Sequence, residues 1–166
     1  MRDRLLIGLG MVATLVVTGA TAVDMERVQA TGDTVLLELA PVDPRSLIQG
    51  DYMRLRYAAG DVATEAAVDI PNGGDVILTL DDREVGTFAR FDGGEPLGER
   101  ERRFDYHLRD ERVDIGTGSW MFQEGTAEVW NEARYGEFRV LPSGRAVLVG
   151  LRDAELGALG EPLGTW

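Results

Sequence analysis

The side chains that could take part in chemistry belong to few residue types. The chain has 29 acidic residues, 17 basic residues that are all arginine, one histidine and no cysteine. Without cysteine or lysine there is no thiol nucleophile, disulfide, cysteine-based zinc site or Schiff-base lysine. A single imidazole also excludes a metal site built from several histidines. We therefore expect no cofactor and no metal.

The single histidine, His107, does not point to hydrolytic catalysis. It shares the polar face of the strand-like run 103–109 with charged side chains, which is typical of an exposed surface histidine. A Ser-His-Asp triad would have to use Ser46, Ser119 or Ser143, and none of these lies in a nucleophile-elbow sequence. The sequence thus predicts no catalytic residue.

The acidic residues are numerous but show no spacing that singles out a site. No calcium-loop pattern is present, and the runs Asp81–Asp82 and Glu99–Glu101 resemble solvated turns. The net charge of −12 argues against nucleic-acid binding, because DNA affinity depends mainly on cationic contacts with phosphates. We expect a protein that is not an enzyme; an enzyme of unfamiliar type remains an alternative.

A string at residues 50–57 holds the first group of candidate interaction residues. In a strand, Met53, Leu55 and Tyr57 share one face, which suits a core, and the residues between them share the other face. The second face places an aromatic ring beside two guanidinium groups, which suits an acidic or aromatic partner. Alternatively, the string is an ordinary turn followed by a core tyrosine. The candidate residues are Gly50, Asp51, Tyr52, Arg54, Leu55, Arg56 and Tyr57.

A second group of charged side chains follows about 70 residues later. We predict two possible roles: an ion-pair network that joins a helix to the following strand, or an arginine-lined site for an anion. The members are Glu124, Arg134, Tyr135, Gly136, Glu137 and Arg139.

The elements that must position these residues are predicted to be mainly strands. Alternating apolar residues and turn residues predict strands at 34–40, 52–58, 62–68, 76–80, 85–91 and 103–109, and a hairpin of 135–141 with 145–151. Short helices are expected at 43–47, 126–134 and 153–159, and Trp120 and Trp130 are expected in the core. The predicted fold class is a β-rich sandwich or partly open barrel with one or two short helices.

The N-terminus predicts export. Residues 5–23 carry no charge and follow Arg2 and Arg4, and about 20 such residues cross a hydrocarbon core of roughly 30 Å. We expect a single transmembrane helix, with a cytoplasmic N-terminus and a periplasmic or extracellular bulk. A signal peptide cleaved after Ala22 is the alternative.

These features divide the chain into five segments. We predict a cytoplasmic stub at 1–4, the anchor or signal peptide at 5–23, a linker at 24–33, a β-rich extracytoplasmic domain at 34–160 and a tail at 161–166.

Residues 50–57 read G-D-Y-M-R-L-R-Y, and this string resembles the signature of the GDYXXLXY protein family. Flanking stretches also resemble the family: 35–47, 122–125, 133–139 and 148–152. The resemblance implies a small exported protein with an N-terminal membrane segment, often accompanied by polytopic membrane proteins. It implies no reaction.

Two functions are expected from these observations. The first is a non-enzymatic membrane-anchored module that is accessory to an integral membrane protein. The second is an envelope domain that binds a small anionic ligand through its arginine-bearing faces, Arg54 with Arg56 and Arg134 with Arg139.

Overall fold

The computed structural model describes residues 11, 14–16, 18, 28–40, 52–123 and 125–160. Within them the chain is mainly β with few, short helical segments, which confirms the predicted secondary-structure class. The elements are β1 (Asp33–Glu38), β2 (Tyr52–Arg54), α3 (Ala58–Ala66), β3 (Gly73–Leu80), β4 (Gly86–Phe91), β5 (Glu101–Arg109), β6 (Arg112–Ile115), β7 (Ser119–Met121), α4 (Ala127–Trp130), β8 (Tyr135–Val140), β9 (Ala146–Arg152) and β10 (Ala158–Leu159).

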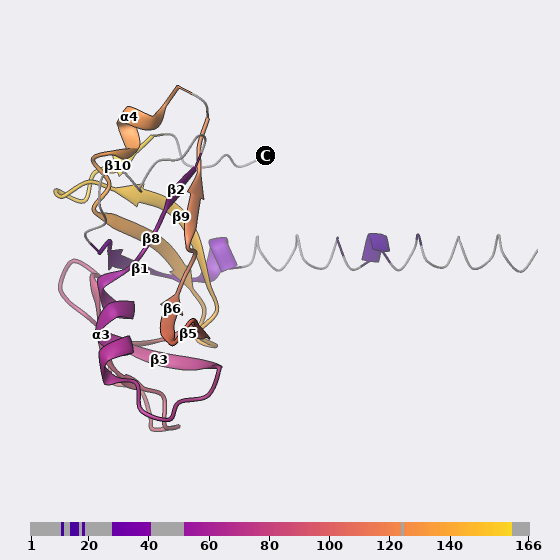
Figure 1. Ribbon diagram of the computed structural model, residues 1–166, viewed down its shortest axis with the longest axis vertical. Coiled ribbons are helices and arrows are strands. Elements are labelled where there is room, and N and C mark those ends of the chain that lie inside the picture. The colour runs from indigo at the N-terminus through magenta and orange to yellow at the C-terminus, as the bar shows by residue number, and fades with distance from the viewer. Residues whose placement is uncertain are drawn as a thin grey trace, which may run out of the picture.

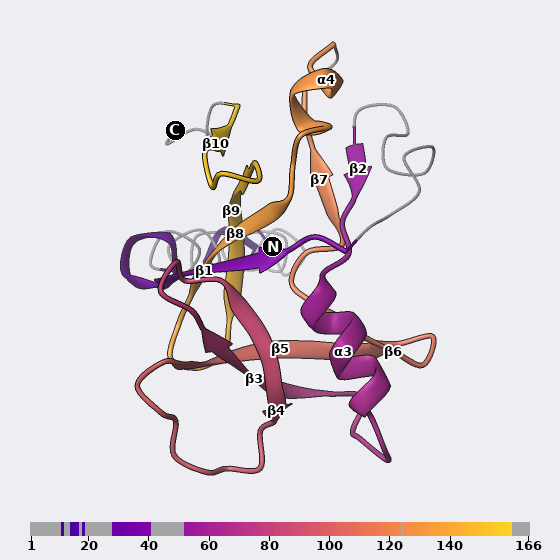
Figure 2. The same ribbon diagram turned by 90° about the vertical axis from the view of Figure 1, so that its left-hand side faces the viewer.

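The described strands form three antiparallel sheets, with the orders β1-β8-β9-β10, β4-β3-β5-β6 and β2-β7. Figures 1 and 2 show the β3–β6 sheet and α3 at one end of the molecule, and β2, β7 and α4 at the other. The two four-stranded sheets join at β1, where Leu36 forms a parallel bridge with Val85 and its N–H donates to the Glu84 carbonyl at 2.9 Å. This joint lets side chains of both sheets share one core.

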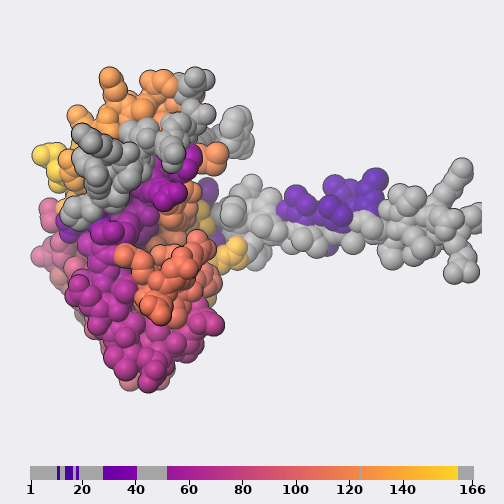
Figure 3. All heavy atoms as spheres, in the orientation of Figure 1, coloured from indigo at the N-terminus to yellow at the C-terminus, as the bar shows by residue number. Residues whose placement is uncertain are grey.

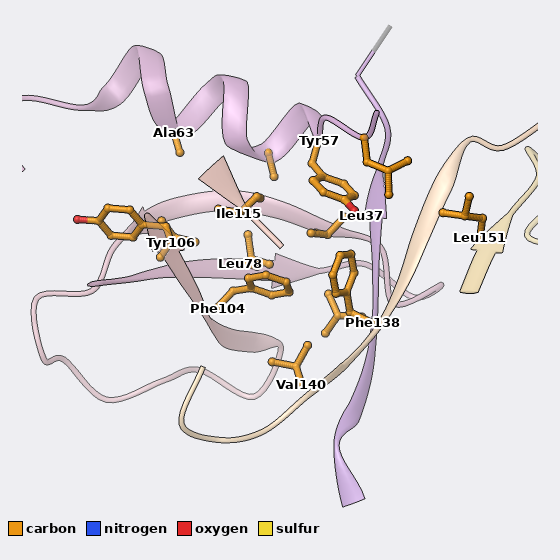
Figure 4. Close-up of a cluster of buried hydrophobic side chains, with 14 of the residues drawn as sticks. Leu37, Tyr57, Ala63, Leu78, Phe104, Tyr106, Ile115, Phe138, Val140 and Leu151 are labelled. Carbon is orange, nitrogen blue, oxygen red and sulfur yellow. The ribbon is translucent and has the colours of Figure 1, made fainter. Parts of the chain in front are cut away.

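Aromatic side chains from different elements meet in that core. Phe104 of β5 lies edge-on to Phe138 of β8, with ring centroids 5.2 Å apart, and Tyr57 lies edge-on to the same Phe138 at 5.4 Å. In Figure 4 the Tyr57 ring lies between the start of α3, Leu37 and Phe138. Edge-to-face pairs at this separation are favourable beyond the area they bury. The last motif residue is thus packed where the sheets meet.

The predicted strand at 62–68 is wrong, because the structure has α3 there. Ala59 and Ala63 are buried on one side of this helix, four residues apart, while Val62 and Val68 are exposed. A four-residue spacing is the helical repeat, and alanine favours helix over strand. The predicted strand at 52–58 is correspondingly shorter: it ends at Arg54, and the chain is helical from Ala58.

Other predicted elements are confirmed or adjusted. The hairpin of β8 with β9 is confirmed. Trp120 and Trp130 are buried, as predicted, with ring centroids 5.4 Å apart. The helix predicted at 126–134 is only α4, four residues long. The predicted last helical turn at 153–159 is wrong, because Asp153 caps a turn that leads into β10. The helix predicted at 43–47 lies outside the described residues.

No helix among the described residues is long and apolar enough to cross a bilayer. Most of the predicted anchor at 5–23 lies outside those residues; Met11, Thr14–Val16 and Thr18 are described, and they are helical. Residues 28–31 form one further helical turn ahead of β1. Val28 in this turn is fully buried, and a Cβ on Gly32 would lie 2.8 Å from the backbone nitrogen of Val140 in β8. The turn therefore packs directly against the β domain.

Candidate functional site

The motif string places its alternate side chains on opposite sides, as predicted. Met53, Leu55 and Tyr57 are all at least nine-tenths buried, while Arg54 and Arg56 are exposed. Pairing at both ends of the string holds this arrangement: Met53 pairs with Trp120, and Tyr57 forms a bridge with Leu39. Gly50 and Asp51, the first two motif residues, lie outside the described residues.

The motif also holds the segment between β6 and β7. The Tyr57 hydroxyl donates to the Thr117 carbonyl at 3.0 Å, and the Leu55 N–H donates to the Gly118 carbonyl at 3.0 Å. Burial raises the pKa of the Tyr57 phenol far above its ordinary value, because the charged phenolate would lose its hydration. Tyr57 is therefore a neutral donor at every physiological pH. Two motif residues thus clamp residues 116–118.

The clamped segment forms one wall of a cleft of about 110 Å³, which we call the motif cleft. Its buried lining comes from Leu55, Tyr57, Gly60, Val113 and Ile115. In the space-filling view, β6 and the residues after it adjoin the stretch from β2 to α3 at the surface (Figure 3). The more exposed lining includes polar and charged side chains: Arg56, Asp61, His107, Arg109, Arg112 and Asp114.

Arginines converge on a single aspartate in the motif cleft. Arg56 Nη2 lies 3.2 Å from one carboxylate oxygen of Asp61, and Arg112 Nη2 lies 2.6 Å from the other. Arg109 lies 3.8 Å from Asp114, at the limit of an ion pair. The prediction that His107 is an exposed surface residue is confirmed, and it pairs with Asp114 across β5 and β6.

A second surface lies on the short two-stranded sheet. Directly opposed residues of an antiparallel pair project from the same face. Tyr52 is opposite Met121, and Arg54 is opposite Ser119, so these four form one face, which we call the ribbon face. The other face carries Met53 and Trp120 into the core. Met121 is 73% exposed, which is unusual for a large apolar side chain.

The second predicted group forms an ion-pair network, but within the sheet. Glu137 is buried, and one of its carboxylate oxygens accepts a hydrogen bond from Arg152 Nε at 2.9 Å and lies 2.8 Å from Arg152 Nη2 in an ion pair. Arg139 lies 3.7 Å from the other oxygen. Arg134 instead donates to the carbonyls of Asn131 and Ala133, so it does not join the network.

Two glycines lie beside this network. Gly150 lies directly opposite Glu137, and the carboxylate reaches diagonally past it to Arg152; a Cβ on Gly150 would lie 3.7 Å from Glu137 Oε2, an ordinary contact. Gly136 faces inward, where a Cβ would lie 3.0 Å from Tyr57 Cε1. Tyr135, between Arg134 and Gly136, is half-buried opposite Arg152. Glu124 lies outside the described residues.

Several residues of these surfaces were not predicted. Arg112 and Arg109 are distant in sequence from the motif and meet Arg56 only because α3 packs against β6. For Met121, the sequence offered no indication of a surface role beyond its position next to Trp120. Arg152 had one: it falls in the stretch 148–152 that resembles the family. Within the described residues, no group of three or more His, Asp or Glu could hold a metal ion.

Comparison with known proteins gives one match. A family model described as GDYXXLXY protein matches residues 14–151, which is most of the chain. No curated protein and no solved structure matches.

Proposed function

Since the chain belongs to the GDYXXLXY protein family, we propose that it is a non-enzymatic module, anchored in a membrane and facing the extracytoplasmic side, that serves an integral membrane protein as an accessory subunit. The starting point is what the family resemblance implies: exported proteins that accompany polytopic membrane proteins. The domain contributes an interaction surface, and we assign it no catalytic step.

The observation that carries this proposal is the composition of the ribbon face. An exposed Met121 lies opposite Tyr52, and Arg54 lies on the same face two residues further along β2. Tyrosine, methionine and arginine are enriched at protein interfaces, and tyrosine and arginine often account for much of the binding energy. Because Met53 and Trp120 fix the ribbon from beneath, the face is presented on a packed support. The occupant we propose is an extracytoplasmic segment of the membrane partner with acidic or aromatic side chains.

The anchor rests on the uncharged run at 5–23 and on its described residues. Met11, Leu15 and Val16 are helical, and each is about two-thirds exposed. Apolar side chains on an isolated helical segment suit a lipid environment, where they need no protein cover. We therefore place the protein in the membrane as a single-pass protein, with residues 34–160 on the periplasmic or extracellular side.

Affinity purification of the tagged full-length protein from gently solubilised membranes tests this function. We expect a polytopic membrane protein to co-purify in stoichiometric amount with the wild type. The double variant Arg54→Ala/Met121→Ala should reduce the amount of co-purified partner by about tenfold or more, because both side chains belong to the ribbon face. The control is Val68→Ala, since Val68 is 79% exposed but lies beyond α3.

Two results would contradict the proposal. If the folded double variant retained the partner as well as the control does, the ribbon face would not be the interface. Recovery of the wild type in the soluble exported fraction would overturn the anchor and favour cleavage after Ala22.

A further inference from the structure

The motif cleft presents arginines that are already held in place. Asp61 uses one oxygen for Arg56 and the other for Arg112, so a single carboxylate fixes two guanidinium groups. Each of these arginines contacts Asp61 through Nη2 only, and both side chains are 46% exposed. A guanidinium has five N–H donors, so Asp61 leaves most donors of both arginines unused. Ordering two arginines in advance lowers the entropy cost of binding.

The charge balance of the cleft differs from that of the chain. Three arginines line it against two aspartates, whereas the whole chain has a net charge of −12. The third arginine, Arg109, lies 3.8 Å from Asp114 and is 77% exposed, so that pair is weak and screened. A locally positive cleft is left beside a buried apolar lining of Leu55, Tyr57 and Ile115.

We propose that the motif cleft binds the oxyanion group, a carboxylate or a phosphate, of a small molecule. Arg56 and Arg112 donate to the oxyanion through N–H groups that Asp61 leaves unused, and Arg109 supplies a third cation at the edge. Arginine is the side chain best matched to both groups, because its planar fork donates two parallel hydrogen bonds. A volume of about 110 Å³ suits a single such group. The inference does not depend on the partner of the ribbon face.

The single histidine of the chain provides a direct probe of this site. His107 lines the cleft, so its ring resonances report there without competing imidazole signals. The full-length protein in detergent micelles is titrated with inorganic phosphate and, separately, with acetate, at fixed pH and fixed ionic strength. We expect a saturable shift of the His107 resonances with at least one anion. The anion that saturates identifies the group as a phosphate or a carboxylate.

Matched variants separate a site from a general salt effect. Arg112→Ala and, as a second variant, Arg56→Ala should each lower the affinity for the saturating anion by about tenfold, because each removes a charge-assisted hydrogen bond. Arg100→Ala is the control, because it removes the same charge from another exposed Arg–Asp pair, with Asp82. Thermal unfolding without ligand verifies that each variant is folded.

Two outcomes would overturn the proposal. One is a response to both anions that is linear and never saturates. The other is equal binding by the folded Arg112→Ala, Arg56→Ala and Arg100→Ala proteins, which would place the anion outside the cleft.

Discussion

Tyr57 makes two contacts of structural consequence: its ring packs on Phe138 and its hydroxyl donates to the Thr117 carbonyl. Tyr57→Phe keeps the ring and removes only the hydrogen bond. We expect a loss of about 1 kcal/mol in the free energy of unfolding, because Thr117 is exposed and water can replace the donor. Amide hydrogen exchange at Leu55, whose N–H donates to the Gly118 carbonyl, should become faster as the segment loosens. Urea denaturation and exchange measured by NMR check the two effects.

Tyr135→Phe is the matched control for that substitution. Tyr135 is half-buried on β8 and is not part of the clamp. An equal loss of stability in both variants, with unchanged exchange at the Leu55 amide, would contradict the role assigned to the Tyr57 hydroxyl.

Asp75 carries a predictable pH dependence. Burial raises its pKa; Arg103, 3.7 Å away, lowers the pKa and nearby Asp92 raises it. Asp105, directly opposite on β5, has a raised pKa as well, because of burial and, in smaller part, the charge of Asp75. A carboxyl whose pKa is higher in the folded state makes the protein less stable as the pH rises through that pKa. Asp75→Asn should therefore stabilise the protein at about pH 7, by up to about 1 kcal/mol given the partial exposure of the site. The gain should vanish at low pH, where both side chains are neutral.

Asp92→Asn should have the opposite effect and destabilise the protein at neutral pH. The hydrogen bond from Arg103 Nε, 2.7 Å long, lowers the pKa of the Asp92 carboxyl. Its contribution is present at neutral pH and is lost as the pH falls through its lowered pKa. Thermal unfolding from about pH 3 to pH 7 compares the two variants. A pH-independent effect in both would refute the electrostatic explanation.

At the scale of elements, the β8–β9 pair offers a test of packing with a built-in control. A Cβ on Gly136 would lie 3.0 to 3.2 Å from the side chains of Tyr57, Phe138 and Leu148. Gly136→Ala should therefore cost about 1–3 kcal/mol through overpacking. Gly150→Ala, on the neighbouring strand, meets only Glu137 Oε2 at 3.7 Å and should stay within about 0.5 kcal/mol of the wild type. Urea denaturation measures the stability of both variants. Equal losses of stability would mean that strand propensity, and not contact with the core, determines the effect of the substitution.

The strands and helices also differ in how well the sequence alone predicts them. Alternation predicted β5 and the β8–β9 hairpin because each has one apolar face over many residues. It failed at α3, where Ala59, Gly60 and Ala63 form the buried face. Small residues have weak apolar contrast, so a helix face built from them does not stand out against a two-residue period.

At the scale of the whole molecule, the candidate surfaces are only partly predictable. The opposite faces of the motif follow from strand geometry, so the roles of Tyr52 and Arg54 against Met53 could be predicted. The motif cleft could not, because its arginines meet only after α3 packs on β6. The diagonal pair of Glu137 with Arg152 depends likewise on the register that sets Gly150 opposite the carboxylate.

The central claim is that the ribbon face binds an integral membrane partner. The most direct measurement is photo-crosslinking in intact cells, with a photoreactive side chain at position 121 and, as a control, at position 68. Both positions are exposed, at 73% and 79%, but only Met121 belongs to the ribbon face. We predict a single crosslinked membrane protein from position 121 and none from position 68. Equal crosslinking from both positions, or none from position 121 in a folded protein, would contradict the claim.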